Sequence, residues 1–440
     1  MEDHLTKYTN PSPNFHTPSP SPHVVIFPLP IQAPVNCMLK LADLILSLSP
    51  AAVSVTFLTT DYIHHRLVLN SNAAARLVHY KPHFRFETVP DGLGPDEIPR
   101  NVPLLTISLE AQAQTEEVAK ELNVPLVYFD TISPCCLWTL LCIPNMLKAA
   151  DLPFQVLKKV QNFPKAQGHI IDTFDKLEGD YFTHVRALCP NVYDIGPLHL
   201  NLKCRIQQET TKSISNSLWQ EDRSCLAWLD AQPSKSVLFV SIGSIASLTK
   251  QQLMEIWYGL VNSKTRFLWV QRPGSIIELN GKIEMNQNLE IPEDVVEGTK
   301  ARGCIVSWAP QEEVLAHGAI GGFLTHSGWN STLESIATGV PMICWPFRID
   351  QPANSRVVTE LWKIGLDMNK DNCNRVVVEK LIKNLMETRR DELSKRAREM
   401  AKLAAQAVAK DGTSYHSLNR LIDDIVFMRF PLLNNSLQTE

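Results

Sequence analysis

The segment from Trp308 to Gln351 carries the densest group of potentially ligand-binding side chains in this 440-residue chain. It reads WAPQEEVLAHGAIGGFLTHSGWNSTLESIATGVPMICWPFRIDQ and combines indole rings, amides, hydroxyls and carboxylates. Aromatic faces stack on nucleobases, and polar side chains together with helix N-terminal amides bind phosphates. Carboxylates and carboxamides form hydrogen bonds with sugar hydroxyls. This mixture of residue types predicts a site for a sugar nucleotide.

The first residues of this segment suit a nucleobase. We expect Trp308 to stack its indole on the base, while the backbone at Ala309 and the side chain of Gln311 supply hydrogen bonds. A tryptophan at the end of a strand is about as often a buried core residue. The Pro-Gln pair that follows Trp308 favours the nucleotide site.

Three polar residues lie where an expected strand gives way to a helix. The side chains of His326, Asn330 and Ser331 and the first amides of that helix could converge on a diphosphate without a metal ion. Asn330 or Ser331 could also be an ordinary helix cap. The two roles do not exclude each other, because capping and anion binding use the same amides.

The remaining polar residues of the segment suit the sugar groups. Glu334 lies one helical turn after Asn330, where its carboxylate could accept hydrogen bonds from ribose hydroxyls. Asp350 and Gln351 offer further acceptors and a donor to the hydroxyls of a hexose. We interpret His317, within the same segment, as structural.

These residues need elements that carry them to one place. Short apolar runs typical of buried parallel strands alternate with segments of helical spacing, which predicts an α/β fold with two doubly wound domains facing each other across a cleft. The expected strands cover residues 23–28, 53–58, 84–89, 124–129, 169–174, 236–244, 267–272, 304–310, 321–326 and 341–346.

The same patterns divide the chain into five parts. Residues 1–22, rich in Pro and Ser, are expected to be disordered. Residues 23–196 form the first domain, and 197–235 a polar linker with one helix. Residues 236–410 form the second domain. Residues 411–440 are a C-terminal helix and tail, expected to pack back on the first domain.

The composition excludes several classes of protein. The 42 basic and 46 acidic residues are mixed along the chain and give a net charge of −4, so nucleic acid is not an expected partner. The ten cysteines have neither zinc-ligand spacing nor the density of a secreted scaffold, which favours a cytoplasmic location. The N-terminal residues resemble no signal peptide, and no membrane span is expected. The sequence gives no indication of the oligomeric state.

The segment from Trp308 to Gln351 resembles the signature of plant-type UDP-dependent glycosyltransferases that act on small molecules. The order Trp, Pro-Gln, His, Gly-Gly, Thr-His, Gly-Trp-Asn-Ser, Glu, Gly-Val-Pro, Pro and Asp-Gln carries the resemblance. Weaker similarity extends from His23 onward, closest to enzymes that glucosylate iridoid or terpenoid acceptors. The resemblance implies a metal-independent GT-B enzyme that binds the acceptor in its N-terminal domain and the nucleotide sugar in its C-terminal domain.

The resemblance also implies the donor. In this family a Gln at the last motif position, here Gln351, goes with glucose, and a Trp before the Asn, here Trp329, fits the same sugar. The expected donor substrate is therefore UDP-glucose, with no separate cofactor. Ser244, which follows Gly243, resembles the loop on the phosphate side of the family's site.

The loop after the first strand departs from the family. Family members carry Gln-Gly-His there, and this His takes the proton from the acceptor hydroxyl. The corresponding residues here are Gln32, Ala33 and Pro34, and proline has no titratable group. Loss of a positioned general base typically costs about 10²–10⁴-fold in rate.

Two further segments of the first domain look abbreviated. Between Thr88 and Val124 the family supplies another apolar strand and the Asp partner of its His, whereas this chain has the polar stretch NVPLLTISLEAQAQTEEVAKELN. Residues 153–169 also look short. We therefore expect an incomplete N-terminal sheet, whether from a splice variant, a gene-model error or a decaying paralogue.

Three hypotheses about function follow. The first is an inverting UDP-glucose-dependent glucosyltransferase, impaired by the loss of its base; a carboxylic acid acceptor, already ionised near neutral pH, would need no base. The second is an inactive UDP-sugar-binding paralogue or truncated variant. The third, a phosphorylase or glycogen-synthase-like protein, lacks its signature residues. His23, His64 and His65 are interpreted as surface or strand-end residues rather than replacement bases.

Overall fold

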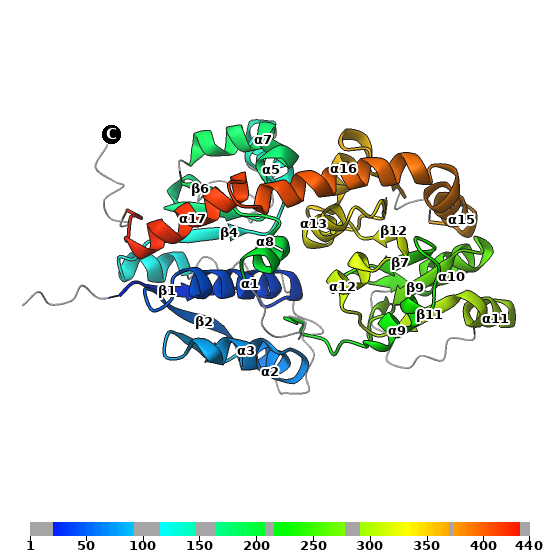
Figure 1. Cartoon of the computed structure of the whole chain (residues 1–440), viewed down its shortest axis with the longest axis horizontal. Helices are drawn as coiled ribbons and strands as arrows, with labels where there is room; N and C mark the ends of the chain where they lie inside the picture. Colours follow the sequence, from blue (N-terminus) through cyan, green and yellow to red (C-terminus); the bar gives the residue numbers. More distant parts are fainter. Residues whose placement is uncertain are drawn as a thin grey trace, which may run out of the picture.

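The computed structural model describes two α/β halves that lie side by side (Figure 1). All the strand pairings within the described residues are parallel. The described residues are 21–91, 115–146, 163–189, 191–206, 215–277, 291–368 and 373–431. The expectations for residues 1–20, 92–114 and 153–162 therefore lie outside the described residues.

The C-terminal half is built on one continuous six-stranded sheet. Its strand order is β11-β9-β7-β12-β13-β14, which in order along the chain is the 3-2-1-4-5-6 arrangement of a Rossmann fold. The order reverses between β7 and β12, and ligands bind at such a switch point, beyond the carboxyl ends of the strands. The strands are β7 (Val237–Ser241), β9 (Arg266–Val270), β11 (Gly303–Val306), β12 (Ile320–Thr325), β13 (Met342–Cys344) and β14 (Gly365–Asp367).

Local sequence signals set the ends of the helices around this sheet. Thr249 and Gln252 form a capping box that starts α10. Gly339, with φ of 66°, ends α13 in the left-handed conformation that glycine adopts without strain. The helices are α10 (Lys250–Asn262), α11 (Glu293–Arg302), α12 (Gln311–Ala316), α13 (Trp329–Thr338), α14 (Gln351–Arg356) and α15 (Arg375–Lys383), and a small ribbon pairs β8 (Leu248–Thr249) with β10 (Ile276–Ile277).

The N-terminal half has the same strand sequence divided into two sheets. One sheet has the order β1-β2-β3 and the other β4-β5-β6. Joined edge to edge, they would repeat the 3-2-1-4-5-6 order, but within the described residues β1 and β4 do not pair. The missing strand was expected between Thr88 and Val124, and residues 92–114 of that stretch lie outside the described residues. The strands are β1 (His23–Ile26), β2 (Ser54–Thr60), β3 (Phe84–Val89), β4 (Val127–Asp130), β5 (Gly168–Ile171) and β6 (Val192–Asp194).

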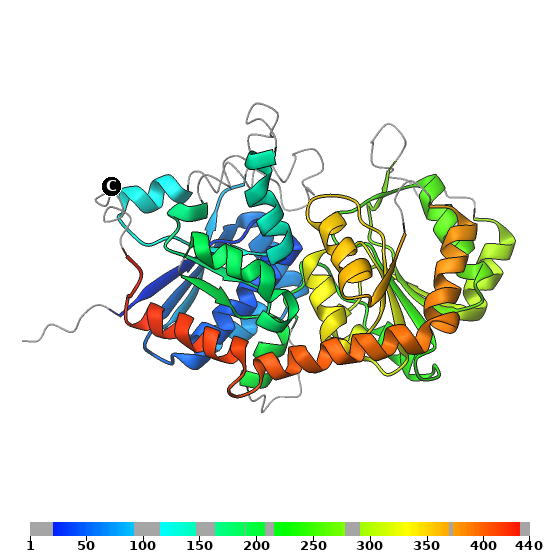
Figure 2. The same cartoon turned by 90° about the horizontal axis from the view of Figure 1, so that it is seen from above.

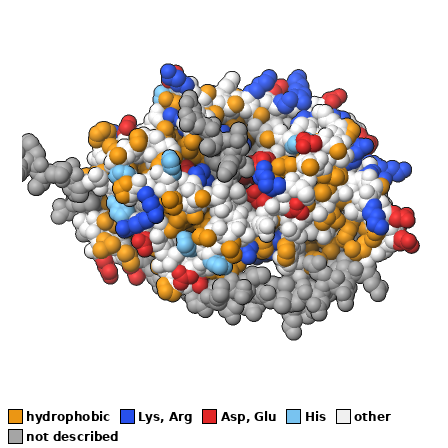
Figure 3. Space-filling view, turned by 60° about the horizontal axis from the view of Figure 1, so that its bottom comes forward, with side chains coloured by type: hydrophobic (Ala, Val, Ile, Leu, Met, Phe, Trp, Pro, Cys, Tyr) orange, Lys and Arg blue, Asp and Glu red, His pale blue; other side chains and the backbone are white. Residues whose placement is uncertain are grey.

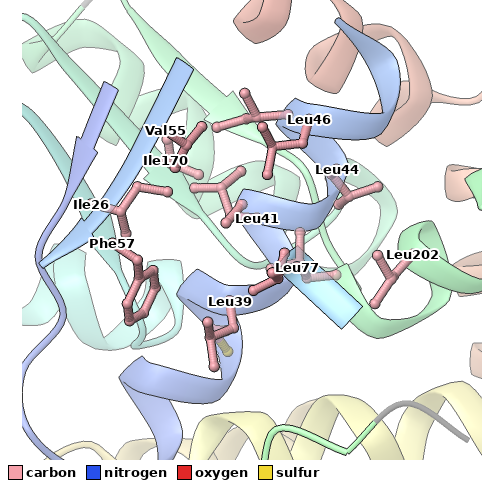
Figure 4. Packing of buried hydrophobic residues seen from close by; sticks show 14 of the residues in the cluster. Ile26, Leu39, Leu41, Leu44, Leu46, Val55, Phe57, Leu77, Ile170 and Leu202 are labelled. Atoms are coloured by element: carbon pink, nitrogen blue, oxygen red, sulfur yellow. The ribbon is translucent and has the colours of Figure 1, made fainter. Parts of the chain in front are cut away.

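The core of the N-terminal half forms around α1 (Gln32–Leu48). The apolar residues of α1 face the strands β1 and β2 (Figure 4), so burial of this helical stripe fixes the start of the helix close to β1. The helix begins at Gln32, and Pro34 fits its first turn, where no backbone donor is needed. The other helices of this half are α2 (Asp61–Asn70), α3 (Ala73–Leu77), α5 (Pro134–Met146) and α7 (Asp175–Leu188).

The segment predicted to be a linker with one helix contains two helices. The expected helix is α9 (Ser224–Asp230), whose Cys225 and Leu229 are buried in the core of the C-terminal half. The additional helix is α8 (Leu198–Arg205), which packs on α1 through Leu198 and Leu202. Sequence analysis missed α8 because its sequence, LHLNLKCR, is largely polar and its buried apolar stripe is short.

The C-terminal helices span both halves. In Figure 2, α16 (Arg390–Val408) runs along one side of the molecule and continues into α17 (Thr413–Val426). Helix α16 contacts α13 in one half and α7 and α8 in the other, and α17 lies against β6. The chain turns at Gly412, the N-cap of α17. None of the helices that the structure describes is long and apolar enough to cross a membrane.

Candidate active site

A cavity of about 2400 Å³ lies between the two halves and is lined by both. The carboxyl ends of β7, β11 and β12 open into it from the C-terminal half, as the switch-point rule predicts. On the face shown in Figure 3, basic and acidic side chains are interspersed. All the ligand-binding residues expected from the sequence line this cavity: Ser244, Trp308, Ala309, Gln311, His326, Trp329, Asn330, Ser331, Glu334, Asp350 and Gln351.

Trp308 lies just after β11 and is held from behind by the linker. The ring of Trp219 lies 5.8 Å from that of Trp308 between centroids, at 31°. The backbone N–H of Asp222 donates to the carbonyl of Trp308 over 2.9 Å. Trp219 does not line the cavity, so it supports the Trp308 ring from outside the site. Trp219 lies in the polar linker, and sequence reasoning assigned it no role.

Gln311 joins two of the expected ligand groups. It is the first residue of α12, and its Nε2 donates to Ser331 Oγ at 2.9 Å and to Glu334 Oε2 at 2.7 Å. Burial, together with repulsion from Glu312, raises the pKa of Glu334 to about 7. Glu334 is therefore a carboxylate that changes its charge near neutral pH.

His326 follows β12 and packs against two glycines. A Cβ at Gly243 or Gly328 would lie 2.5 Å from the imidazole, so both positions require glycine. Gly243 also has φ of 77°. Burial lowers the pKa of His326 to about 4, and its Nδ1 has no hydrogen-bond partner among the described residues. At neutral pH the ring is uncharged and can donate one hydrogen bond.

The N-terminus of α13 faces the cavity without a side-chain cap. Gly328 is its N-cap, so neither Asn330 nor Ser331 is the cap that the sequence allowed. Asn330 Nδ2 donates to the Ala33 carbonyl at 3.3 Å and to Cys37 Sγ at 3.0 Å, across the two halves. Trp329 is buried, and its Nε1 donates to the Asp172 carbonyl at 2.7 Å. The start of α13 thus combines anion-binding amides with contacts between the halves.

The last two expected residues lie at the start of α14. Asp350 Oδ2 accepts a hydrogen bond of 2.6 Å from Asn354 Nδ2. Gln351 Oε1 accepts hydrogen bonds from the backbone N–H groups of Phe347 at 2.8 Å and Arg348 at 3.0 Å. These bonds fix both side chains before any ligand arrives. His317, interpreted as structural, binds Asp230 at 3.1 Å and does not line the cavity.

The loop after β1 offers no base to this cavity. Gln32 is bound to the linker backbone, where its Oε1 accepts from the N–H of Leu218 at 2.7 Å. Ala33 presents its carbonyl to Asn330. Pro34 lines the cavity but has no proton acceptor on its side chain. His23, at the other end of β1, binds Thr56 at 2.8 Å.

A buried His–Asp pair in the N-terminal half is not a replacement base. His169 Nδ1 lies 2.8 Å from Asp130 Oδ2, and Nε2 lies 2.9 Å from the Phe163 carbonyl. Both ring nitrogens are therefore engaged, and Phe163 stacks on the ring with centroids 3.7 Å apart. His199 also lines the cavity, but burial lowers its pKa to about 3, which makes it a weak base.

Sequence reasoning missed a charged group between the halves. Lys40 on α1 forms a buried ion pair with Glu312 on α12. Asp172, after β5, lies near the same place, and burial raises its pKa to about 6. The signal for Lys40 was its position as a lone cation within the apolar run MLKLADLIL. Within the described part of the chain, no group of His, Cys, Asp and Glu side chains is arranged to hold a metal ion.

Comparison with known proteins gives a consistent result. The family model described as UDP-glucoronosyl and UDP-glucosyl transferase matches residues 143–397. The 7-deoxyloganetic acid glucosyltransferase of Catharanthus roseus is 43% identical over 92% of this chain and 97% of its own length. The 7-deoxyloganetin glucosyltransferase of Catharanthus roseus is 34% identical, over 92% of this chain and 96% of its own.

Solved structures are similar over most of their length. Phytolacca americana UGT2 complexed with UDP-2fluoro-glucose and pterostilbene has a TM-score of 0.69 at 27% identity, and the match covers 92% of this chain and 99% of that one. A UDP-glucosyltransferase from Polygonum tinctorium capable of glucosylating indoxyl has a TM-score of 0.71 at 25% identity, covering 93% and 99%.

Proposed function

The chain belongs to the UDP-glucoronosyl and UDP-glucosyl transferase family and is a UDP-glycosyltransferase with a small-molecule acceptor; from this premise we propose that its donor is UDP-glucose and that its acceptor chemistry is limited by the missing base. The GT-B fold and the family expected from the sequence are thereby confirmed. Below, the donor half is the C-terminal half from β7 to α16, and the acceptor half is the N-terminal half from β1 to α8 together with α17.

One observation carries the donor proposal. Trp308, His326, Glu334 and Gln351, which come from three successive strand–helix units, line one cavity at the switch point of the sheet. In the proposed complex Trp308 stacks on the uracil, and Glu334 accepts from the ribose hydroxyls. The sugar lies against Asp350 and Gln351, with Trp329 behind it.

The proposed diphosphate site uses neutral donors and a helix terminus. His326, whose pKa is lowered by burial, donates a hydrogen bond to the diphosphate. The free amides at the start of α13 and the loop at Ser244 supply the rest. These fixed donors stabilise the charge that develops on UDP as it leaves. The acceptor attacks the anomeric carbon from the opposite face, so the configuration inverts.

We propose that acceptors with an ionised oxygen react faster than alcohols. Pro34 removes the proton acceptor from the position next to the sugar, and the described His–Asp pair has no free nitrogen. A carboxylate is already deprotonated at neutral pH, so ester formation needs no base. The relative named for 7-deoxyloganetic acid supports terpenoid- or iridoid-like acceptors as the first compounds to test.

A second candidate function is retention of UDP-sugar without turnover. Pro34 and the separation of the described acceptor-half strands into two sheets favour it, because both features lie in the acceptor half, while the donor half has a continuous sheet. Calorimetry with UDP-glucose, followed by turnover assays on matched alcohol and carboxylate acceptors, separates the two. Turnover of the carboxylate alone supports the base-free enzyme, binding without any turnover supports the second candidate, and no binding contradicts both.

A further inference from the structure

A buried ion pair joins the two halves beside the proposed ribose site. The side chain of Lys40, 6% exposed, reaches from α1 to Glu312 on α12. Lys203 on α8 lies 3.9 Å from the other oxygen of Glu312. Burial alone would lower the pKa of Lys40, but the carboxylates of Glu312 and Glu334 outweigh burial and raise it. Lys40 is therefore a charged group that the acceptor half inserts into the donor half.

Glu334 lies next to this pair. Gln311, which donates to Glu334 Oε2 at 2.7 Å, is the residue immediately before Glu312. Lys40, Glu334 and Asn330 also line one small buried cavity. Removing either charge of the ion pair would therefore change the field at Glu334 while leaving the Gln311 hydrogen bond in place.

We propose that Lys40 is a positioning residue that keeps Glu334 ionised, by neutralising the adjacent Glu312, so that the ribose of the donor meets a carboxylate. The inference rests on the proposed UDP-glucose site. It makes an acceptor-half residue a determinant of donor affinity, acting through Glu312 and Glu334. Lys40 is the cation that lowers the pKa of Glu334, against burial and the repulsion of Glu312.

The other titratable groups around Glu334 do not replace Lys40. Asp172, from the end of β5, adds negative charge and raises the pKa of Glu334 further. Cys37 on α1 stays protonated, because burial raises the pKa of its thiol. His199 on α8 is uncharged at neutral pH, because burial lowers its pKa to about 3. Asp350, at the start of α14, lines the large cavity and brings no positive charge.

The test measures the affinity for UDP-glucose, without acceptor, from about pH 5.5 to about pH 9. UDP-glucose is the probe because UDP carries a terminal phosphate that itself titrates near pH 6. For the wild-type chain we expect binding to strengthen as pH rises through about 7, where Glu334 ionises. In Lys40→Met the midpoint moves up by about one unit, so affinity at pH 7 falls by about fivefold.

Three further variants separate charge from structure. Lys40→Arg keeps the wild-type midpoint, because it keeps the charge. Glu312→Gln lowers the midpoint, and Lys40→Met with Glu312→Gln brings it back toward wild type, since the charge that Lys40 neutralises is gone. Glu334→Gln removes the pH dependence. A purely structural role for Lys40 would weaken binding at every pH without moving the midpoint.

The outcomes distinguish this inference from the function on which it rests. If wild-type protein does not bind UDP-glucose, the proposed function fails and the inference fails with it. If it binds, and folded Lys40→Met has the wild-type midpoint, only the role of Lys40 is overturned. Lys40→Met leaves the buried charge of Glu312 unpaired, which can prevent folding. If this variant does not fold, Glu312→Gln serves as the test. A lower midpoint for UDP-glucose binding in Glu312→Gln supports the inference, and an unchanged midpoint overturns it.

Discussion

The donor and acceptor halves share one strand order but differ in continuity. In the donor half, β7 and β12 pair directly, so the loops that follow them bring Gly243 against His326. In the acceptor half, the corresponding strands are β1 and β4, and within the described residues each pairs only on its far side, with β2 and β5. The proposed donor site therefore has a continuous sheet beneath it, whereas the described strands on the acceptor side form two separate sheets.

The comparison shows that two separate changes meet at one place. Pro34 stands where the base was expected in the loop after β1, and among the described residues no strand pairs with the free side of that same strand. A switch point needs two adjacent strands whose loops diverge. The described residues of the donor half have this geometry and the proposed ligand groups, whereas those of the acceptor half show neither a strand paired between β1 and β4 nor a titratable group at position 34.

The largest expected difference between the halves is in hydrogen exchange. Amides of β1 and β4 should exchange at least about a hundredfold faster than those of β7 and β12, because strands paired on one side open at lower cost. Hydrogen-exchange mass spectrometry of peptides covering the four strands measures this. Equal protection in both halves would mean that the acceptor sheet is closed in solution, and the comparison would fail.

A substitution in the donor loop should be nearly as damaging. In Gly243→Ala the new Cβ would lie 2.5 Å from His326, and the residue has φ of 77°. We expect UDP-glucose affinity to fall by about a hundredfold, from backbone strain and loss of the His326 hydrogen bond.

The matched control for this variant is Gly274→Ala. Gly274 has φ of 72° but no atom within 4 Å of the Cβ position. It carries similar backbone strain without the clash, so its UDP-glucose affinity should stay close to wild type. An equal loss in both variants would show that general destabilisation, rather than displacement of His326, reduces binding.

Restoring the base should repair the acceptor half only in part. Ala33→Gly with Pro34→His rebuilds the family's loop, and we expect about a tenfold gain in kcat on alcohol acceptors, well short of the full effect of about 10²–10⁴. We expect the gain to be limited because the stretch that carries the family's Asp partner of this His looks abbreviated in the sequence. Rates with a carboxylate acceptor serve as the control and should not change; a gain of equal size there would exclude proton removal as the cause.

The smallest expected effect is at an exposed ion pair between the linker and the donor half. Arg223 donates to both carboxylate oxygens of Glu313, at 2.8 and 2.6 Å, with side chains 44% and 37% exposed. Arg223→Ala should lower the free energy of unfolding by less than about 1 kcal/mol, because solvent screens such pairs. Urea denaturation measures it. A loss as large as that of the buried Lys40→Met would contradict the distinction between the two contacts.

Most of the donor half could be predicted from sequence because its ligand groups are contiguous. From Trp308 to Gln351 each group follows a strand of clear apolar character, and parallel strands bring those ends together. The roles assigned to these residues stay predictions until donor binding is measured. Strands β6, β8, β10 and β14 were not predicted: each has only two or three residues, and none stands in a longer apolar run like PMICWP, which revealed the equally short β13.

The contacts between the halves could not be predicted in the same way. Lys40 and Glu312 are far apart in the chain, and no periodicity links them. Nor does a pattern within one strand reveal which strand lies beside it, so the break between β1 and β4 could be placed only in the structure. A lone charged residue in a buried helix, as at Lys40, signals a partner without identifying it.

The corner between α16 and α17 limits how the cleft can open. Because α16 is fastened to both halves and α17 only to the acceptor side, the chain between Val408 and Thr413 is the place where a rotation can be absorbed. Asp411 there has φ of 69°, and a Cβ at Gly412 would lie 2.3 Å from the carbonyls of Gln406 and Ala407. Close packing therefore restricts the backbone at the very place where a relative rotation of the two helices would have to be absorbed.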